Sequence, residues 1–528
     1  MEQVYDAVVV GAGPNGLVAA NLLVDAGWKV VVLEAADQPG GAVRSATDIP
    51  APGFTADLFS AFYPLAAASP AIGGLGLDAY GLVWAHAPAV LAHVLDDGRA
   101  AVLARDEDQT AASLDAFAAG DGDTWRRWAR RWREIEQPAL GALLRPFPPV
   151  RDGVAIVRRL GVNRSLRLAR LATLPARRFV EEEFRGAGAG LLVAGNALHT
   201  DLSPEAAGSS LYGLLLAMLG QHHGFPVPRG GSGKLSDALV ARLANKGGEL
   251  RCGAEVRTVV LGDAGADGVI LADGRRVRAR HAVLADVPAP LLYRRLVGEA
   301  HLSSRLRHDL TRFQWDNSTV KVNWAIDRPI PWKAAEAGRA GTVHLGGGLD
   351  DMTRYSADLA TRTVPKRPFI VLGQMSTTDP TRSPAGTEAA WAYAHLPRGD
   401  HSPETVAAFT DAIDSEVERQ APGFRDAVRA RVVQAPTDLQ MANAALDRGA
   451  LNGGTAAIHQ QLVFRPTPGL GRPDTPIPGL FLAGSSAHPG GGVHGACGAN
   501  AARVALLRSR VGRRMYDASV GALQRYLS

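Results

Sequence analysis

The fold of this protein is decided by residues 5–34, which read YDAVVVGAGPNGLVAANLLVDAGWKVVVLE. Residues 5–10 form a short apolar, β-branched run of the kind that is buried in a parallel sheet. Residues 14–26 follow the helical period, and Gly27 suits the left-handed position after a helix end. Residues 29–33 read as a second buried strand. The sequence therefore predicts a strand–helix–strand unit with a glycine loop in its first turn.

Each glycine of this loop has a physical task in binding a dinucleotide. Gly11 allows the tight turn, Gly13 lets the backbone approach a pyrophosphate, and Gly16 lets helix and strand pack closely. The positive end of the helix that begins at Pro14 faces the phosphates. Glu34, after the second strand, is placed to accept hydrogen bonds from ribose hydroxyls and would repel a 2′-phosphate. We therefore predict a dinucleotide other than NADP.

Two further glycine-rich stretches refine this prediction. Residues 38–45 read QPGGAVRS, where an NAD-binding dehydrogenase would need a simple third strand. Gly40 and Gly41 permit close backbone contact, and Arg44 could supply charge to a diphosphate or a carboxylate. Near the other end of the chain, residues 479–495 read GLFLAGSSAHPGGGVHG, which predicts a strand, a glycine-rich loop and then an alanine-rich helix.

These motifs give the sequence a resemblance to a known family. Together with GNALH at 195–199 and PRGGSG at 228–233, they resemble the FAD-dependent phytoene desaturase superfamily. Within it, the sequence is more similar to the branch of desaturase-type carotenoid ketolases and pyridine nucleotide-disulfide oxidoreductase domain-containing protein 2. The resemblance implies an extended FAD, with its adenine end on the N-terminal unit and its flavin against the C-terminal helix.

The resemblance also implies which residues hold the cofactor. The implied FAD-binding residues are Gly11, Gly13, Gly16, Glu34, Gly40, Gly41, Val256, Gly484, Gly491, Gly492 and Val493. From their places in these motifs, Pro14, Arg44 and His488 are predicted to contact the cofactor as well. Two positions depart from the family pattern, because Ala42 stands where many relatives have Arg, and His494 where relatives have an apolar or small residue. A helix N-terminus beside the flavin would stabilise the negative charge of its reduced form.

The predicted fold class is α/β, with a Rossmann-like FAD-binding domain of the glutathione-reductase type around a central parallel sheet. This domain is discontinuous and would comprise residues 1–75, 226–300 and 474–528. Residues 250–260 read as one of its strands. A hairpin after that strand predicts the small antiparallel sheet that is typical of this flavin fold.

The remaining residues, 76–225 and 301–473, are expected to form a discontinuous α+β substrate domain. Its predicted strands are 320–324, 369–374 and 391–395. Its Arg-rich segment, 125–185, has Arg alternating with Leu, Val and Trp at helical spacing. Such a segment is typical of a membrane-surface helix. A solvated face that packs on the domain's own core and a protein interface are the alternatives.

Composition excludes several classes of protein. With 46% hydrophobic and 21% charged residues, the chain of 528 residues is not expected to be disordered. Its two cysteines, Cys252 and Cys497, cannot form a disulfide framework and fit a reducing, cytoplasmic compartment. The first residues do not read as a signal peptide. The longest apolar helical stretch, 211–219, is about half the length that spans a bilayer.

Nucleic-acid, nucleotide-hydrolysis and metal sites are not expected. The net charge is +5, but only six of the 57 basic residues are Lys, and a basic stripe with interleaved aromatics is missing outside 125–185. The P-loop-like residues 231–234 are followed by Leu235 instead of Ser or Thr. No HExxH motif occurs, and His222 and His223 are adjacent, which would keep them from facing one site on a regular helix or strand.

The expected activity is that of an FAD-dependent dehydrogenase or oxidase. It would remove a hydride from a C–H of a hydrophobic or conjugated substrate, carotenoid-like by the resemblance, and pass electrons to a quinone or oxygen. His494 and His199 are the candidates for an acid–base or substrate-orienting role. A flavin-dependent ketolase or oxygenase, a redox-neutral isomerase, an amine or secondary-metabolite oxidase and a non-catalytic FAD-holding protein remain alternatives.

Overall fold

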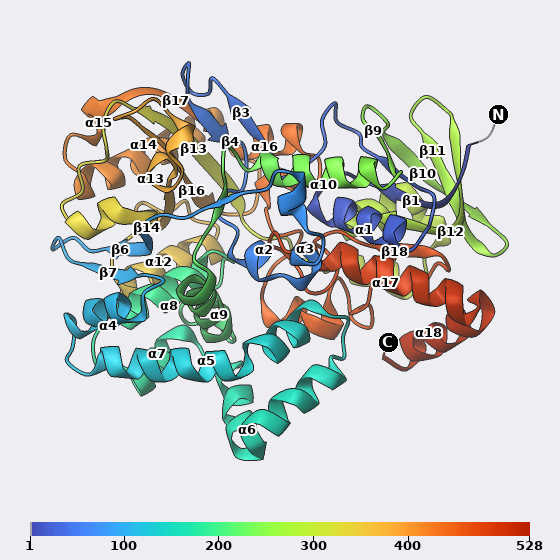
Figure 1. Ribbon diagram of the computed structural model, residues 1–528, viewed down its shortest axis with the longest axis horizontal. Helices are drawn as coiled ribbons and strands as arrows, with labels where there is room; N and C mark the ends of the chain where they lie inside the picture. Colours follow the sequence, from blue (N-terminus) through green and yellow to red (C-terminus); the bar gives the residue numbers. More distant parts are fainter. Residues whose placement is uncertain (1–2, 528) are drawn as a thin grey trace.

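The computed structural model describes residues 3–527 and contains two large sheets (Figure 1). The first has the strand order β10-β11-β12-β1-β2-β9, and β18 also pairs with β12. Its strands are β1 (Gln3–Val10), β2 (Val30–Leu33), β9 (Glu249–Arg251), β10 (Val256–Gly262), β11 (Gly265–Leu271), β12 (Arg276–Ala285) and β18 (Leu480–Leu482). Strands β9, β2, β1, β12 and β18 pair in parallel, whereas β10, β11 and β12 form an antiparallel ladder. The predicted α/β class with a Rossmann-like sheet is therefore confirmed.

Both faces of the first sheet are buried. Helices α1 (Pro14–Asp25), α10 (Gly233–Asn245) and α17 (Ala496–Val511) pack on the face that carries Val9. Val8 belongs to the core of the opposite face, which apolar side chains of residues 292–310 and of the β10–β11 hairpin complete. Because successive strand residues alternate between two buried faces, the strand reads as an uninterrupted apolar run.

The predicted strand 250–260 is wrong in one respect, because the structure divides it into β9 and β10. After β9 the chain leaves the sheet, and Gly253 adopts a φ of 62°. The N–H groups of Gly253 and Ala254 donate to the carbonyls of Ala36 and Glu34. These residues therefore pair with the segment that follows β2 instead of extending the strand.

The second sheet has the strand order β17-β13-β16-β15-β14-β6-β7. Its strands are β6 (Ala89–Val94), β7 (Ala100–Leu103), β13 (Ser318–Ile326), β14 (Ala340–Leu345), β15 (Ile370–Gln374), β16 (Glu388–Leu396) and β17 (Val428–Gln434). Only the β6–β14 pair in this sheet is parallel. All seven strands come from the segments expected to form the substrate domain, whose exact bounds stay a prediction.

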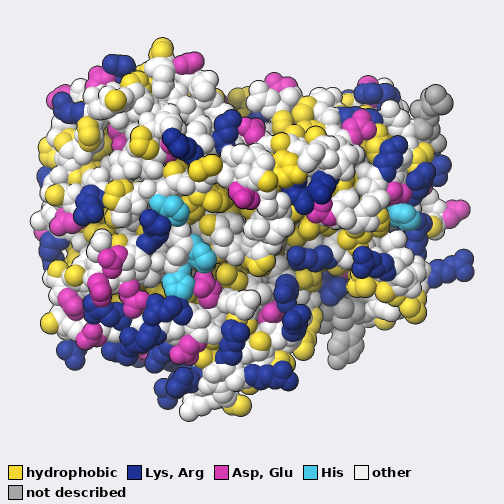
Figure 2. Space-filling model, in the orientation of Figure 1, with side chains coloured by type: hydrophobic (Ala, Val, Ile, Leu, Met, Phe, Trp, Pro, Cys, Tyr) yellow, Lys and Arg dark blue, Asp and Glu magenta, His cyan; other side chains and the backbone are white. Residues whose placement is uncertain are grey.

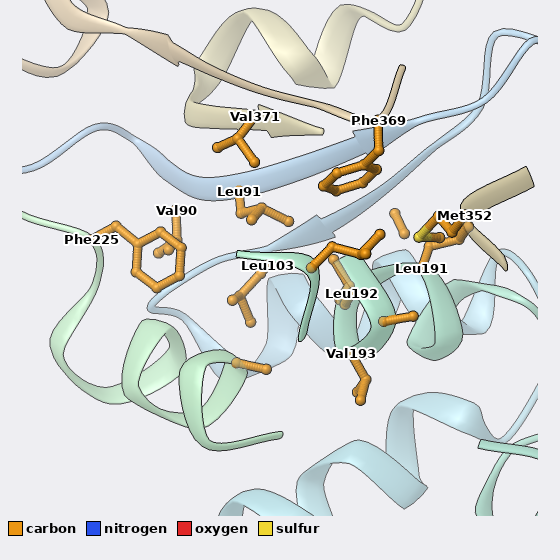
Figure 3. Packing of buried hydrophobic residues seen from close by; sticks show 14 of the residues in the cluster. Val90, Leu91, Leu103, Leu191, Leu192, Val193, Phe225, Met352, Phe369 and Val371 are labelled. Carbon is orange, nitrogen blue, oxygen red and sulfur yellow. The ribbon is translucent and has the colours of Figure 1, made fainter. Parts of the chain in front are cut away.

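The two faces of the second sheet pack against different helices. On one face, Val320, Val322 and Trp324 pack towards α14 (Pro403–Gln420). On the other, apolar side chains meet α8 (Gly188–Leu198) and α9 (Ser209–His223). Figure 3 shows this second core from close by, with the labelled leucines and valines of α8 below the sheet strands.

The Arg-rich segment forms two long helices, α5 (Asp121–Leu144) and α6 (Val150–Leu171). In α5 the Trp side chains face the protein: Trp125 is fully buried and donates to Gln221, and Trp128 packs on the same core. Trp125 is therefore not available to a membrane surface, whereas membrane contact of the Arg-rich segment stays a prediction. Helix α6, in contrast, projects from the body of the molecule (Figure 1).

The remaining helices and strands are short or peripheral. They are α2 (Pro64–Ala68), α3 (Pro70–Gly73), α4 (Glu107–Asp115), α7 (Ala176–Glu183), α11 (Ser304–Thr311), α12 (Leu349–Ala360), α13 (Met375–Thr378), α15 (Phe424–Ala427), α16 (Pro436–Ala442), α18 (Arg513–Leu527), β3 (Ser45–Thr47), β4 (Thr55–Asp57), β5 (Trp84–Ala85) and β8 (Val227–Pro228). Cys252 and Cys497 are both free thiols. Within residues 3–527, none of the helices has the length and apolar character needed to cross a bilayer.

Candidate functional site

Two helices begin side by side at the carboxyl edge of the first sheet. Gly498 of α17 crosses α1 so closely that a Cβ on it would lie 1.8 Å from the carbonyl oxygen of Asn15. Both helices start after a glycine, Gly13 and Gly495, which has no side chain to cap the helix itself. The positive ends of two helices therefore meet at one place, where they favour an anionic group.

The loop with Gly40 and Gly41 lies on the first glycine loop. The N–H of Gly40 donates to the carbonyl of Ala12 at 2.8 Å. A Cβ on Gly41, whose φ is 54°, would lie 3.0 Å from Cα of Gly13. The structure thus brings the predicted Gly pair against the backbone of the N-terminal motif.

Glu34 and Val256, both predicted to contact the adenosine, share one corner of the site. The Glu34 carboxylate accepts the N–H of Ala12 at 2.7 Å and the N–H of Ala36 at 2.9 Å. The carbonyl of Glu34 accepts the N–H of Ala254, two residues before the buried Val256. Glu34 is thereby held in place, with oxygen lone pairs left for further donors.

Arg44 is largely engaged within the protein. Its Nε donates to the carbonyl of Gly41 at 3.1 Å and its Nη2 to that of Ala442 at 2.6 Å. The guanidinium also lies 5.1 Å from the ring centroid of Phe59. Burial lowers the pKa of Arg44, against the raising effect of nearby Glu34. Its geometry supports the glycine loop more directly than a diphosphate.

Asp286, directly after β12, is a central residue that sequence reasoning missed. Its Oδ2 accepts the N–H of Gly16 at 2.8 Å, and a Cβ on Gly13 would lie 2.6 Å from the same atom. A Cβ on Gly484 would lie 3.1 Å from its Oδ1. Burial raises the pKa of Asp286 to about 7. Its neutral form can therefore lie beneath two helix N-termini without repelling an anion, and its position at the end of a parallel strand was the available signal.

His494, predicted to have an acid–base or substrate-orienting role, is hydrogen-bonded through both ring nitrogens. Its Nδ1 accepts the N–H of Ala496 at 3.0 Å, so its Nε2 carries the hydrogen and donates to the carbonyl of Gly490 at 3.2 Å. Burial lowers the pKa of His494 to about 4. Both nitrogens are thus engaged within the protein, and an acid–base or substrate-orienting role for His494 stays a prediction.

His488 lies in the same loop with one nitrogen unpartnered. Its Nε2 bonds to the carbonyl of Arg145 at 3.0 Å, and its buried Nδ1 has no partner within the described residues. Burial lowers the pKa of His488 to about 4. A neutral imidazole with one free nitrogen can contact a bound group, as predicted for this residue.

The glycines of the C-terminal loop pack against other segments of the chain. A Cβ on Gly491 would lie 2.7 Å from Oδ1 of Asn452, and one on Gly492 would lie 2.9 Å from Cδ1 of Leu65. Val493 packs against the core beneath α1 and α17. Side chains at these two glycine positions would therefore displace their neighbours.

A buried arginine fixes the segment that faces this loop. Arg465 is fully buried and donates to the carbonyls of Asn452 at 2.8 Å, Thr455 at 2.9 Å and Ser485 at 2.7 Å. Burial lowers the pKa of Arg465. The side chain thus joins the segment around 452–455 to the start of the glycine loop, using main-chain oxygens as its partners.

On the second sheet, Lys321 is a second residue whose role the sequence did not reveal. Its Nζ donates to the carbonyl of Asp57 at 2.7 Å and to Oδ1 of Asn323, and it lies 5.5 Å from the ring centroid of Trp391. Burial lowers its pKa to about 7, against the opposing effect of Asp57. The one signal in the sequence was a Lys in the middle of an otherwise buried strand.

The segment after Asp57 connects Lys321 to the glycine loops. Asp57 forms a fully buried ion pair with Arg382 at 2.9 Å. Further along, Ser60 donates its N–H and hydroxyl to the carbonyl of Ala42, which follows the Gly pair. The amine of Lys321 is therefore held near the place where the two sheets meet.

His199, the second predicted catalytic residue, belongs to a buried imidazole cluster. Its Nε2 lies 2.7 Å from Nε2 of His344, and His93 bonds to the carbonyl of Gly347 at 2.8 Å. Burial lowers the pKa of His199 to about 4. The ring is thus neutral, and the structure places it between α8 and β14. A catalytic role for His199 stays a prediction.

The predicted separation of His222 and His223 is wrong, because both face one carboxylate. Nδ1 of His222 lies 2.8 Å from Oε2 of Glu136, and Nε2 of His223 lies 2.6 Å from its Oε1. The two residues are the last of α9, and they use different ring nitrogens. Because each ring meets its own carboxylate oxygen, adjacency does not keep them apart.

Comparison with known proteins identifies the family. The model of the family described as flavin containing amine oxidoreductase matches residues 15–506, nearly the whole chain. The chain therefore belongs to this family. The match includes nearly all of α1 and most of α17, the two helices that meet in the site.

Curated relatives cover the chain nearly end to end. Pyridine nucleotide-disulfide oxidoreductase domain-containing protein 2 of Mus musculus is 28% identical over 95% of this chain and 93% of its own. A lycopene-forming phytoene desaturase of Pseudescherichia vulneris is 26% identical, covering 95% and 98%. A neurosporene-forming phytoene desaturase of Rhodobacter capsulatus is 25% identical, covering 92% and 91%. The resemblance to the phytoene desaturase superfamily is thereby confirmed.

Solved structures share the fold. Putrescine oxidase aligns with a TM-score of 0.60 at 19% identity, over 96% of this chain and 99% of that one. An oxidoreductase from Methanosarcina mazei also gives 0.60, at 18% identity over 95% and 99%. Taken with the family, the protein is an FAD-dependent oxidoreductase. The cofactor expected from the sequence is confirmed, whereas its contact residues and the substrate stay predictions.

Proposed function

We propose that the protein dehydrogenates a hydrophobic or conjugated substrate, a carotenoid-like polyene by its relatives, at a C–H near Lys321. The reaction removes a hydride and a proton and leaves a new C=C or C=N bond. Bound FAD supplies the acceptor for the hydride, and a quinone or oxygen takes the electrons afterwards. Lys321 takes the proton, and Trp391 and Tyr393 on the neighbouring strand offer aromatic surface to the substrate.

The observation that carries this proposal is the meeting of two helix N-termini. Their crossing at Gly498 brings the positive ends of both helices together, where they would stabilise the cofactor's diphosphate and reduced flavin. The buried Oδ1 of Asn15 and Nδ1 of His488 have no partner within residues 3–527, as expected of atoms that contact a bound group. The residues present therefore fit FAD, with Glu34 at its ribose and Asp286 beneath the helix ends.

An anaerobic titration tests the activity. We expect the absorbance of the oxidised flavin to disappear with one equivalent of a suitable substrate, from a panel of carotenoids and amines. Reduction by amines alone would replace the polyene proposal with an amine oxidase. Product formation with no net reduction would indicate a redox-neutral isomerase. Bound FAD that no compound reduces would contradict the proposal and favour a non-catalytic role.

We also propose that α6 contacts a membrane surface. The helix exposes Val150, Val162 and Leu166, each about two-thirds accessible, between several arginines. Gly161, with a φ of 74°, interrupts the helix and changes its direction. Apolar residues among basic ones on a projecting helix suit the interface of an anionic bilayer.

Liposome flotation tests this contact. The protein is expected to float with anionic vesicles at low salt, and to lose this binding in the double variant Val162→Asp, Leu166→Asp, because each change places a charge on the apolar side. The control is Met441→Asp, at an even more exposed apolar residue elsewhere. Equal flotation of the double variant and the control would contradict the proposal.

A further inference from the structure

A cluster of two imidazoles and one carboxylate joins α5 to the end of α9. Glu136, His222 and His223 offer three ligand atoms that all lie within 4.8 Å of one another. Their side chains are 19%, 22% and 33% exposed, so the cluster is half-buried and open to solvent on one side. Figure 2 shows His side chains gathered on this face of the molecule, above the Arg-rich helices.

The local structure explains why these side chains converge. His222 and His223 are in the last turn of α9, where the negative end of the helix favours positive charge. Each ring meets a different oxygen of Glu136, His222 at 2.8 Å and His223 at 2.6 Å. The carboxylate is thus already shared between the two rings.

We propose that these three residues bind a divalent transition-metal ion of the zinc type. The ion would lie between the rings and the carboxylate, with each neutral imidazole carrying its one hydrogen on the nitrogen that faces away from the ion. Two nitrogens and one oxygen form a donor set that zinc accepts, with water at the open position. The two nitrogen–oxygen distances are 2.8 Å and 2.6 Å. They need to increase only slightly for an ion to lie about 2.0–2.2 Å from each ligand atom.

The surroundings select against harder cations. Calcium and magnesium prefer several oxygen ligands, and the cluster supplies one carboxylate. Imidazole nitrogens suit zinc and related transition-metal ions, whereas carboxylate and carbonyl oxygens suit calcium and magnesium.

The consequence of metal binding would be mechanical. Helix α5 is followed by the projecting helix α6, and α9 belongs to the core beneath the second sheet. An ion shared by Glu136 and the two histidines would link α5, and the helix α6 that follows it, to this core. The site is independent of the proposed dehydrogenation, because none of its ligands belongs to the residues argued to hold FAD or substrate.

Equilibrium dialysis of the FAD-loaded protein, purified without a polyhistidine tag and stripped with chelator, tests the site. We expect one Zn²⁺ per chain by elemental analysis, and visible absorption bands of bound Co²⁺ at wavelengths beyond those of the flavin. His223→Ala and Glu136→Gln are each expected to weaken binding at least about tenfold, because each removes a ligand or its charge. Zn²⁺ is also expected to raise the melting temperature of the native protein but not of these variants.

The control is His308→Ala, which removes an exposed histidine from α11. Its zinc affinity and melting temperature are expected to equal those of the native protein. Glu136→Gln keeps the shape of the side chain, so a folded, FAD-containing variant separates loss of a ligand from loss of structure. Absence of saturable zinc binding, or unchanged binding in both His223→Ala and Glu136→Gln, would overturn the proposal.

Discussion

Gly498→Ala is expected to empty the cofactor site and to destabilise the protein by about 1–3 kcal/mol. The new methyl carbon would lie 1.8 Å from the carbonyl oxygen of Asn15 and 2.6 Å from its carbonyl carbon. Both atoms are backbone in the first turn of α1, so no side chain can turn away to make room. Helix α17 would have to move outward and separate the two helix N-termini. The FAD content per chain and the melting temperature measure the two effects.

Gly153→Ala is the matched control for this substitution. Gly153 also lies within a helix, α6, but a Cβ there would meet nothing within 4 Å. Alanine is the better helix former, so this variant is expected to keep its FAD and to gain about 0.5–1 kcal/mol of stability. If Gly498→Ala instead kept native FAD content and melting temperature, the close crossing of α1 and α17 would not be what forms the site.

The sequence predicted those parts of the fold that depend on local order. Within residues 5–34, strand, glycine turn and helix are adjacent in the chain, so hydrophobic period and turn chemistry were sufficient. The approach of residues 484–495 to this unit is long-range and was predicted through the family resemblance. The break between β9 and β10 was missed because Gly253 and Ala254 bond to the segment after β2, a contact that periodicity does not reveal.

Residues whose role depends on burial were harder to predict. In the sequence, Asp286 and Arg465 are single charged residues in a loop or at a strand end. Only the fold shows that Asp286 lies beneath three glycines. Only the fold shows, too, that Arg465 donates to main-chain carbonyls. The helical period of residues in α5 was predicted correctly. That period alone does not distinguish a helix face that contacts lipid from one that packs on a protein core. His494 was singled out because it departs from the family pattern, and its hydrogen bonds show a capping role.

Lys321→Met is expected to lower the turnover number by about 10²–10⁴-fold while FAD remains bound, because removing a general base typically costs this much. Above its lowered pKa of about 7, Lys321 is a neutral amine. Its two hydrogens are donated to Asp57 and Asn323, which leaves the lone pair free to take the substrate's proton. Lys333→Met, at an exposed lysine, is the control and should retain native turnover. Steady-state kinetics with the substrate found by titration gives the comparison.

The pH dependence separates proton transfer by Lys321 from a merely structural role. In the native protein, turnover should rise with pH and level off above about 7, as the amine loses its proton, and this limb should be missing in Lys321→Met. The lowered pKa of Lys321 also makes the free energy of unfolding depend on pH. Between pH 7 and 10.5 the unfolded chain binds the proton and the folded one does not, so the native protein gains stability over the variant as pH rises through this window. A variant that keeps both native turnover and the native limb near pH 7 would mean that another group accepts the proton.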